Sequence, residues 1–291
     1  MAFSGNDVSP DIVGLADALD GSRPALILGG VDTGKTALVR QFVSRWTSQG
    51  LRVGLLCADP GQPLIGLPGT LSLTLLSGDA EALQPDRVAF VGHTSSHHGE
   101  DDLLLALARL LREAVRLAPD RVLVDTCGLI HGPVGVSLKQ QEVDLCAPVE
   151  VLALQRGEEL EPILLPFHRR ADVSLRRLTP SPQVQRKTPA QRRQNRRARF
   201  ADYFSHARRR TFHLHIECED LKGRLCAFQG PEGWAVGLGI LCEIAPERQE
   251  MTFWTPLPEE TEVAAIQVGS LALDPSGDEL GVRSRSPVRY V

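Results

Sequence analysis

The sequence predicts an α/β fold, a parallel β-sheet with helices on both faces, followed by an arginine-rich helix and a small β-rich C-terminal domain. Three observations support this prediction. Apolar runs of strand length alternate with helical patterns of roughly 12 to 18 residues, which calls for right-handed crossovers and a parallel sheet. Arginines are then concentrated between residues 169 and 210. From residue 211 onward the pattern changes to short β-type runs separated by Gly, Pro and acidic turns.

Length and composition are those of a soluble globular protein. The 291 residues suffice for a large α/β domain with a smaller one, with 42% apolar and 23% charged residues and a net charge of −4. No apolar run approaches the roughly 18 residues of a membrane span. Residues 1–13 lack the features of a signal peptide, so we expect a cytoplasmic protein with reduced, mostly buried thiols. No Cys-x-x-Cys pair occurs among Cys57, Cys127, Cys146, Cys218, Cys226 and Cys242.

The first predicted strand, residues 25–28, leads into a glycine-rich loop and then a helix. In the loop GGVDTGKT, two glycines bracket four residues before Lys35 and Thr36, which is the spacing of a phosphate-binding loop, or P-loop. Its N–H groups would bind a nucleoside triphosphate, Lys35 would neutralise the β and γ phosphates, and Thr36 would bind Mg2+. The sheet is therefore expected to be of the P-loop NTPase type. The nucleotide-binding residues are expected to be Gly29, Gly30, Val31, Asp32, Thr33, Gly34, Lys35, Thr36 and Ala37.

Four polar loops follow predicted strands of this sheet. The strands are expected at residues 25–28, 52–58, 87–91 and 121–124, with a further strand at 149–154. Ligands bind at the carboxyl ends of parallel strands, so these loops should bring Lys35, Asp59, His93 and Thr126 to one cleft. Asp125 competes with Asp59 for the metal-binding role, because an aspartate that ends an apolar strand is typical of a Walker B motif.

Helices are expected at residues 8–20, 101–117 and 189–207, whereas residues 59–73 are too rich in Pro and Gly to be helical and are expected to form a loop. The helix at 189–207 has proline in its first turn and an aromatic anchoring face of Phe200, Tyr203 and Phe204. Most charge runs are solvated helix faces, but this one has no acidic partners among five closely spaced arginines, which favours a phosphate-facing role. These are Arg192, Arg193, Arg196, Arg197 and Arg199.

The C-terminal region has β-type runs at residues 211–216, 225–228, 234–244 and 264–273 and shows no recognisable catalytic motif. His213 and His215 fall on one face of a predicted strand and could bind a metal. Packing against the domain is the favoured interpretation of these two side chains.

Four sequence elements and the arginine segment together resemble the polynucleotide 5′-hydroxyl kinases. That family includes the kinase subunit of the pre-mRNA cleavage machinery and the nucleolar kinases of ribosomal RNA processing. The elements, in matching order, are GGVDTGKT (29–36), DPGQPLIGLPGTLSL (59–73), VGHTS (91–95) and VDTCGLIHG (124–132). The resemblance covers about residues 24–204, and the D-x-G-Q element followed by P-G-T is fairly specific to the family.

The resemblance implies transfer of the γ-phosphate of ATP, or another nucleoside triphosphate, to the 5′-hydroxyl end of RNA or DNA. Asp59 would be the general base, and Lys35, Arg193 and Arg196 would complete the catalytic set, with the arginines on a mobile lid. Thr36 and Asp59 would hold the magnesium ion. The acceptor strand would be bound by Gln62, His93, Thr126, Gly128, Leu129, Arg192 and Arg199.

The chain departs from the resembling eukaryotic sequences at two positions. They have tryptophan, which can stack on a nucleobase, where this chain has Leu129, and tend to have asparagine where it has Asp125. Two other functions remain open, a non-catalytic ATP-binding adaptor of an RNA-processing complex and a nucleotide-hydrolysing switch. The residues do not distinguish RNA from DNA or ATP from GTP, and they identify no protein partner and no membrane attachment.

These expectations divide the chain into four parts. Residues 1–20 form an N-terminal helix, 21–178 the P-loop kinase domain, 179–210 the arginine-rich lid segment, and 211–291 the small β-rich domain.

Overall fold

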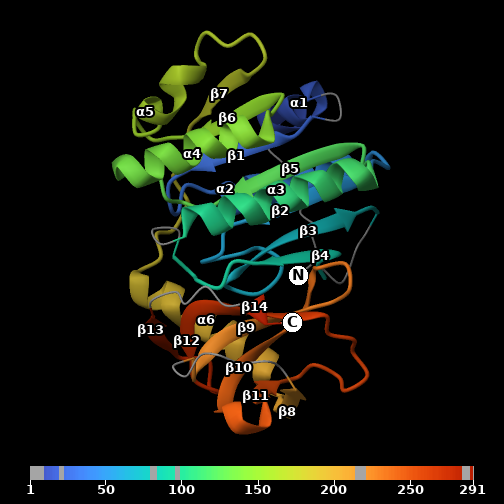
Figure 1. Cartoon of the computed structure of the whole chain (residues 1–291). Helices are drawn as coiled ribbons and strands as arrows, with labels where there is room; N and C mark the ends of the chain where they lie inside the picture. Colours follow the sequence, from blue (N-terminus) through green and yellow to red (C-terminus); the bar gives the residue numbers. More distant parts are fainter. Residues whose placement is uncertain are drawn as a thin grey trace.

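The computed structural model of the chain describes residues 10–19, 23–78, 84–95, 99–213, 221–283 and 289–290. The molecule has an α/β half built on one sheet and a second half built on an antiparallel sheet, with helix α6 (Pro189–Phe204) beside the second sheet (Figure 1).

The first sheet has seven strands in the order β4-β3-β2-β5-β1-β6-β7. The strands β1, β2, β5, β6 and β7 run parallel to one another, and every residue of β1, β2 and β6 is buried. Burial on both faces explains why these strands are continuous apolar runs in the sequence. The strands are β1 (Ala25–Gly29), β2 (Val53–Ala58), β3 (Thr70–Leu76), β4 (Arg87–Phe90), β5 (Arg121–Thr126), β6 (Glu150–Leu154) and β7 (Ser174–Leu178).

Strand β3 is a correction to the predicted loop at residues 59–73, whose last four residues belong to it. It runs antiparallel to both β2 and β4, so one strand of the sheet departs from the parallel arrangement. The reason is the connection after β2, which contains no helix: a short link returns the chain in the opposite direction, whereas a parallel neighbour needs a long crossover.

Helices cover both faces of the first sheet, as predicted. One face packs on α1 (Pro10–Ala18) and α2 (Lys35–Ser48) through Ala25 and Ile27 of β1. The alternate residues of β1, Leu26 and Leu28, face α3 (Glu100–Leu117), α4 (Gly132–Cys146) and α5 (Glu161–Leu164). This alternation of side chains along a strand is what gives the sheet two separate apolar layers.

The second sheet is antiparallel, with strand order β13-β12-β9-β10-β11-β8 and β14 paired to β12. The predicted β character of the C-terminal region is therefore confirmed, although β8 begins inside the range 179–210 predicted for the lid segment. The strands are β8 (Arg208–His213), β9 (Arg224–Gln229), β10 (Ala235–Ala245), β11 (Glu250–Thr255), β12 (Ala265–Leu273), β13 (Glu279–Val282) and β14 (Arg289–Tyr290).

Two smaller predictions on this half have different outcomes. The packing role predicted for His213 is wrong, because its side chain is 77% exposed at the edge strand β8, and His215 lies outside the described residues. The buried thiols are confirmed at Cys57, Cys127, Cys146 and Cys226, Cys242 is half-buried, and Cys218 lies outside the described residues. In the described part of the chain, no helix combines the length and apolar character that a bilayer crossing requires.

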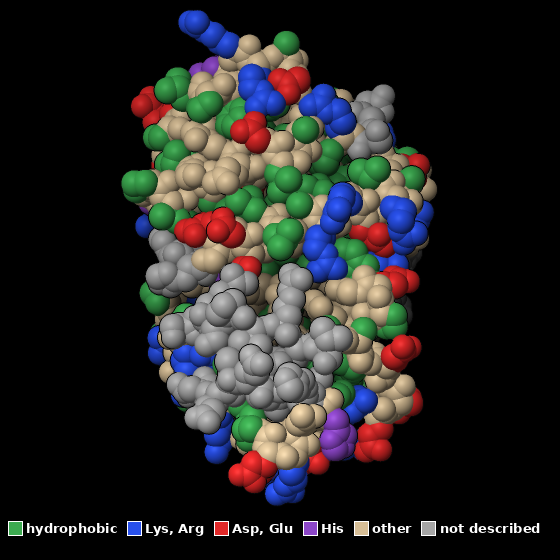
Figure 2. All heavy atoms as spheres, viewed as in Figure 1, with side chains coloured by type: hydrophobic (Ala, Val, Ile, Leu, Met, Phe, Trp, Pro, Cys, Tyr) green, Lys and Arg blue, Asp and Glu red, His purple; other side chains and the backbone are tan. Residues whose placement is uncertain are grey.

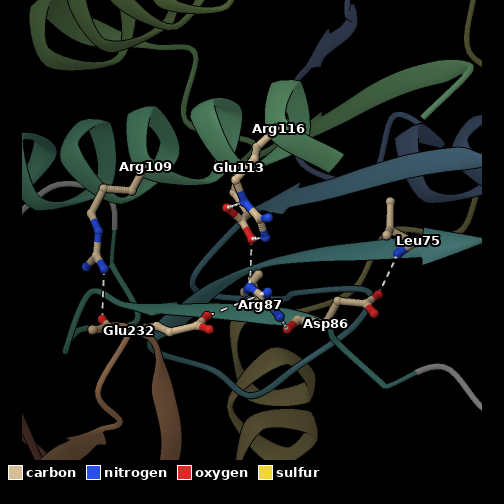
Figure 3. A network of polar contacts seen from close by, with 8 residues as sticks. Leu75, Asp86, Arg87, Arg109, Glu113, Arg116 and Glu232 are labelled. Carbon is tan, nitrogen blue, oxygen red and sulfur yellow. Dashed lines mark hydrogen bonds and ion pairs between the residues drawn. The ribbon is translucent and has the colours of Figure 1, made fainter. Parts of the chain in front are cut away.

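The two halves are joined by polar contacts and by a close backbone approach. In the polar network of Figure 3, Arg87 lies 2.8 Å from Glu113 of α3 and 3.7 Å from Glu232, which belongs to the turn between β9 and β10. The backbone N–H groups of Ser270 and Leu271 both donate to the Gly92 carbonyl at 2.9 Å. A Cβ on Gly269 would lie 2.7 Å from the Gly92 Cα, so only glycine permits this contact.

Candidate active site

The P-loop lies between the end of β1 and the start of α2, as the sequence predicts. Gly34 precedes the helix with φ +95°, a left-handed conformation that favours glycine, and Asp32 adopts φ +54°. Gly29 ends β1 and is constrained by space, because a Cβ there would lie 2.6 Å from Thr33 Oγ1 and 3.0 Å from the Leu154 carbonyl. The loop thus places its backbone N–H groups and the positive end of the α2 dipole at one point.

Lys35 lies at this point with 9% of its surface exposed. Its Nζ donates to the carbonyls of Gly29 (2.8 Å) and Gly30 (2.7 Å). Burial lowers the pKa of Lys35, while the nearby carboxylates of Asp125 and Asp59 oppose that change. The ammonium group is therefore held by the loop itself, at the position where a bound phosphate would need it.

Two aspartates lie on adjacent parallel strands beside the P-loop. Asp59 follows β2 and accepts, through Oδ1, the N–H groups of Gly61 (2.8 Å) and Gln62 (2.9 Å). Asp125 on β5 is only 5% exposed, and its Oδ1 has no hydrogen-bond partner within the described residues. The pKa of Asp125 is raised to about 7, chiefly by burial; the positive charge of Lys35 opposes this rise and the negative charge of Asp59 adds to it.

These groups line one cleft of about 740 Å³. The predicted site residues that line it are Val31, Asp32, Thr33, Gly34, Lys35, Thr36, Asp59, Gln62, Thr126, Gly128, Leu129, Arg192, Arg196 and Arg199. Asp125, the rival for the metal role, lines it as well. The sequence did not single out Thr94, Val184, Gln185, Lys187 or Asn195, which also line the cleft.

His93 is one predicted site residue that the structure places elsewhere. It is 2% exposed, its Nε2 lies 3.3 Å from the Gly99 carbonyl, and it lines a different cavity of about 410 Å³ with Asp102 and Gln267. Its neighbour Thr94 lines the main cleft instead. The chain bends at Thr94, so these neighbouring side chains point into different cavities.

The loop after β5 packs directly on the P-loop. A Cβ on Gly128 would lie 2.7 Å from the backbone nitrogen of Val31, so glycine is required for this contact. Thr126 is fully buried and its hydroxyl donates to the Ile27 carbonyl at 2.7 Å. Its side chain therefore fixes β5 to β1, and Leu129, which is partly exposed, is the larger side chain that this loop offers to the cleft.

Helix α6 covers the cleft with one face only. Its start is fixed by Pro189 and by a capping box in which Thr188 and Gln191 exchange hydrogen bonds, and its end is anchored by buried Phe200 and Phe204. Arg192, Arg196 and Arg199 line the cleft at helical spacing. Arg193, predicted to be catalytic, is exposed and does not line the cleft, because one residue along a helix turns the side chain by about 100°.

Polar contacts hold α6 and the segment before it close to the P-loop. Arg192 Nη2 lies 2.5 Å from Asp32 Oδ2, which also accepts the backbone N–H of Lys187 at 2.9 Å. Arg199 Nη1 donates to the Pro63 carbonyl at 2.5 Å in the loop that follows Asp59. The P-loop aspartate thus anchors the arginine helix, a role that the sequence pattern did not indicate.

Three basic side chains suited to phosphate binding, those of Arg192, Arg196 and Arg199, lie on the face of α6 that lines the cleft. On the face shown in Figure 2, by contrast, basic and acidic side chains are interspersed over the described surface. The net charge of −4 therefore coexists with a cationic cleft wall.

A fully buried ion pair supports the loop after β5 from behind. Lys139 and Glu142 on α4 are both 0% exposed, and Lys139 Nζ lies 2.8 Å from Glu142 Oε2 and 3.2 Å from Cys127 Sγ. Burial opposes the charge on Lys139, but Cys127 and Glu142 more than offset it and raise the pKa of this lysine. The i, i+3 spacing of a lysine and a glutamate on a helix is the only sequence pattern that indicates this pair.

The residues of the cleft fit a magnesium ion. Mg2+ takes oxygen ligands and commonly uses one or two carboxylates, with water and substrate phosphates completing its coordination. The unpartnered Oδ1 of Asp125, the carboxylate of Asp59 and the hydroxyl of Thr36 all belong to residues that line the cleft. Among the described residues no cluster of three His, Cys, Asp or Glu side chains forms a metal site.

Comparison with known proteins identifies the family. A family model described as the P-loop region of the mRNA cleavage and polyadenylation factor CLP1 matches residues 29–206, more than half of the chain. A polyribonucleotide 5′-hydroxyl-kinase of Pyrococcus horikoshii is 33% identical over 219 residues, covering 73% of this chain and 59% of that protein. A polyribonucleotide 5′-hydroxyl-kinase of Pyrococcus abyssi is 25% identical, and its alignment covers 96% of this chain and 97% of that protein.

The fold comparison agrees with the sequence comparison. The structure of Clp1p in complex with Pcf11p matches this structure with a TM-score of 0.69 at 15% identity, covering 92% of this chain and 80% of that one. The chain belongs to the CLP1 P-loop family.

Proposed function

We propose that this chain is a polynucleotide 5′-hydroxyl kinase that transfers the γ-phosphate of a nucleoside triphosphate to the 5′-hydroxyl of RNA. The observation that carries the proposal is the single cleft in which a P-loop lysine, two aspartates and a row of arginines meet. Phosphoryl transfer is catalysed mainly by positioning and by stabilising negative charge, and these are the groups that it requires. The relatives named above are polyribonucleotide kinases, which supports RNA as the acceptor.

In this proposal the P-loop binds the triphosphate and Lys35 exchanges its two loop carbonyls for phosphate oxygens. The exchange exploits a group that is already buried and correctly placed, so little rearrangement is needed when the nucleotide binds. Arg192, Arg196 and Arg199 would approach the phosphates from α6 on the opposite wall. Their charges would exclude water and stabilise the transferring group.

Asp59 is the proposed general base. Two N–H groups fix its Oδ1, which leaves Oδ2 available to accept the proton of an acceptor hydroxyl in the cleft. Asp125 is more deeply buried and its unpartnered oxygen suits a metal ligand better than a base. Thr36, Asp59 and Asp125 would hold Mg2+, which supplies positive charge to the β and γ phosphates when bound.

Label transfer from γ-labelled ATP to a 5′-hydroxyl RNA oligonucleotide tests the proposal. The same RNA with a 5′-phosphate is the control, because it offers no acceptor hydroxyl, and a DNA of the same sequence measures acceptor preference. A kinase labels the 5′-hydroxyl RNA and leaves the 5′-phosphate RNA unlabelled. Nucleotide binding without transfer would instead indicate a non-catalytic adaptor, and ATP hydrolysis that does not depend on the oligonucleotide would indicate a switch.

A further inference from the structure

The loop of residues 274–278, between β12 and β13, brings the C-terminal half next to the arginine helix that lines the cleft. Asp274 Oδ1 accepts the N–H groups of Ser276 (2.8 Å) and Asp278 (3.0 Å) and the hydroxyl of Ser276 (2.7 Å). Gly277, with φ +86°, packs on α6: a Cβ there would lie 2.6 Å from the Arg197 carbonyl. The loop is therefore a fixed platform against the arginine helix.

The residue that follows this loop, Glu279, reaches an arginine of the cleft. Both carboxylate oxygens of Glu279 accept hydrogen bonds from Arg196, one from Nε and one from Nη2, each at 2.7 Å. Thr94, which lines the cleft, donates its hydroxyl to the same carboxylate at 3.0 Å. The side chains of Arg196 and Glu279 are 17% and 12% exposed, so this pair is shielded from solvent far more than a surface ion pair.

The geometry of the pair leaves one side of the guanidinium available. Glu279 engages Nε and Nη2, and no contact to Nη1 of Arg196 is made within the described residues. Arg196 lines the cleft in this paired state. Glu279 therefore holds the arginine at the cleft rather than away from it.

We propose that Glu279 is a positioning residue for phosphoryl transfer, which holds the guanidinium of Arg196 towards the transferring phosphate. The C-terminal half then completes the active site of the α/β half. This inference rests on the proposed kinase function.

The physical reason is preorganisation. A free arginine side chain loses rotamer entropy when it is fixed, and the bidentate contact to Glu279 fixes Arg196 before the substrate binds. Burial alone would raise the pKa of Glu279, but the hydrogen bonds and the charge of Arg196 lower it below its usual value, so the pair is ionised. A guanidinium fixed in advance stabilises charge that develops in transfer without reorganising at that moment.

The test is steady-state kinetics of Glu279→Gln, which keeps the size of the side chain and removes its charge. We expect kcat to fall by roughly 10- to 100-fold, the loss typical of a misplaced catalytic group, with the KM for ATP within about twofold of wild type. Asp278→Asn is the matched control, since Asp278 belongs to the same loop but pairs with the outward-facing Arg197 at 3.2 Å. This control should retain wild-type kcat.

A double-mutant cycle shows whether Glu279 acts through Arg196. In an Arg196→Ala background, Glu279→Gln should cause no further loss of kcat, because the group that it positions is gone. Equal losses of kcat in the wild-type and Arg196→Ala backgrounds would overturn the proposal. An unchanged kcat for Glu279→Gln would overturn it too, and a higher kcat would mean that Glu279 restrains Arg196 instead of positioning it. Thermal melting of each variant separates these outcomes from loss of folding.

The same experiments distinguish failure of this inference from failure of the proposed function. If the wild-type protein transfers no phosphate to 5′-hydroxyl RNA, the kinase proposal is wrong and the role of Glu279 in it is wrong too. If wild type is active and Glu279→Gln behaves like the Asp278→Asn control, only the positioning role is wrong.

Discussion

At the scale of single residues, Lys35 is the most direct test of the site. The P-loop N–H groups carry only partial charges, so we expect Lys35→Ala to lower phosphoryl transfer by roughly 10²- to 10³-fold or more. Lys35 also makes two hydrogen bonds to the loop, so its removal should be followed by thermal melting as well as by label transfer. A folded variant that transfers phosphate at a near wild-type rate would show that the site is misassigned.

The two aspartates differ in burial and in hydrogen bonding, and this difference predicts different phenotypes. Asp59→Asn keeps the side-chain shape but removes the base, so nucleotide binding should survive while kcat falls by roughly two to four orders of magnitude. Asp125→Asn should chiefly raise the Mg2+ concentration needed for half-maximal activity, because its free Oδ1 suits a metal ligand. Magnesium titrations of both variants check this, and the reverse pattern would exchange the two roles.

Leu129 decides how the acceptor base is held. An aliphatic side chain cannot stack on a base as an indole does, and such stacking contributes roughly 1–3 kcal/mol. We therefore expect acceptor binding to depend mainly on phosphates, and so to weaken steeply with salt. Leu129→Trp should lower the KM for a single-stranded acceptor by roughly 5- to 100-fold, with the KM for ATP unchanged.

Titration of wild type and Leu129→Trp with 5′-hydroxyl oligonucleotides at two salt concentrations measures both effects. Wild-type binding that is insensitive to salt, or a folded tryptophan variant with an unchanged KM for the acceptor, would show that the loop after β5 does not contact the base.

At the scale of elements, the predictable parts are those with a strong local pattern. β1, β2, β5 and β6 are continuous apolar runs, and α6 carries its own cap and aromatic anchor. The strand β3 was not predicted, because its first four residues fell in the predicted loop at 59–73. Its antiparallel direction depends on the connection before it and not on its own composition. β7 was missed because it is an edge strand with exposed arginines, so burial leaves little pattern in its sequence.

The orientation of α6 yields a prediction at this scale. The helix presents Arg192 and Arg196 to the cleft and Arg193 and Arg197 to the outside. Replacement of the inner pair by alanine should lower kcat by roughly 10²- to 10³-fold, because it removes charge that stabilises the transferring group. The outer pair changed to alanine is the matched control, with the same change in net charge and helix composition.

Kinetics of these two double variants decide between a specific site and general basicity. If α6 forms a specific site, only the variant that lacks Arg192 and Arg196 loses kcat. The variant that lacks Arg193 and Arg197 then binds the acceptor slightly more weakly, and only at low salt. Equal losses of kcat in both variants would mean that α6 acts through its total charge.

At the scale of the whole molecule, the cleft is assembled from segments that are far apart in the sequence. The P-loop, the loops after β2 and β5, and α6 could each be predicted to line it from their own residues. The contacts between these segments could not be predicted, because they join residues far apart in the sequence. Arg192 and Asp32 are 160 residues apart, and Arg196 and Glu279 are 83 residues apart. Arg193 and His93 were predicted as site residues but do not line the cleft, because which of two neighbouring side chains faces it depends on how α6 and the segment after β4 pack.

The ion-pair network around Glu113 should make the stability of the fold sensitive to acid. Hydrogen bonds from Arg116 and then Arg87 hold the pKa of Glu113 at about 2, although partial burial acts in the opposite direction. A carboxyl whose pKa is lowered by folding stabilises the folded state above its unfolded pKa of about 4.5. This contribution to stability is lost as the pH falls from about 4.5 through 2. The carboxylate of Glu113 also holds Arg87, which contacts Glu232 of the second half (Figure 3).

Thermal melting of wild type and Glu113→Gln between pH 7 and pH 3 measures this contribution. The variant should melt lower than wild type at pH 7. The difference in Tm should narrow below about pH 4.5, because Glu113 of the unfolded protein then takes up a proton while that of the folded protein, with its pKa of about 2, stays charged. Asp17→Asn removes a more exposed ion pair with Arg45, at 2.7 Å, and should change Tm little at either pH. A Tm difference for Glu113→Gln that stays constant across this range would mean that its charge does not hold the network together, and that the hydrogen bonds alone join α3 to β4.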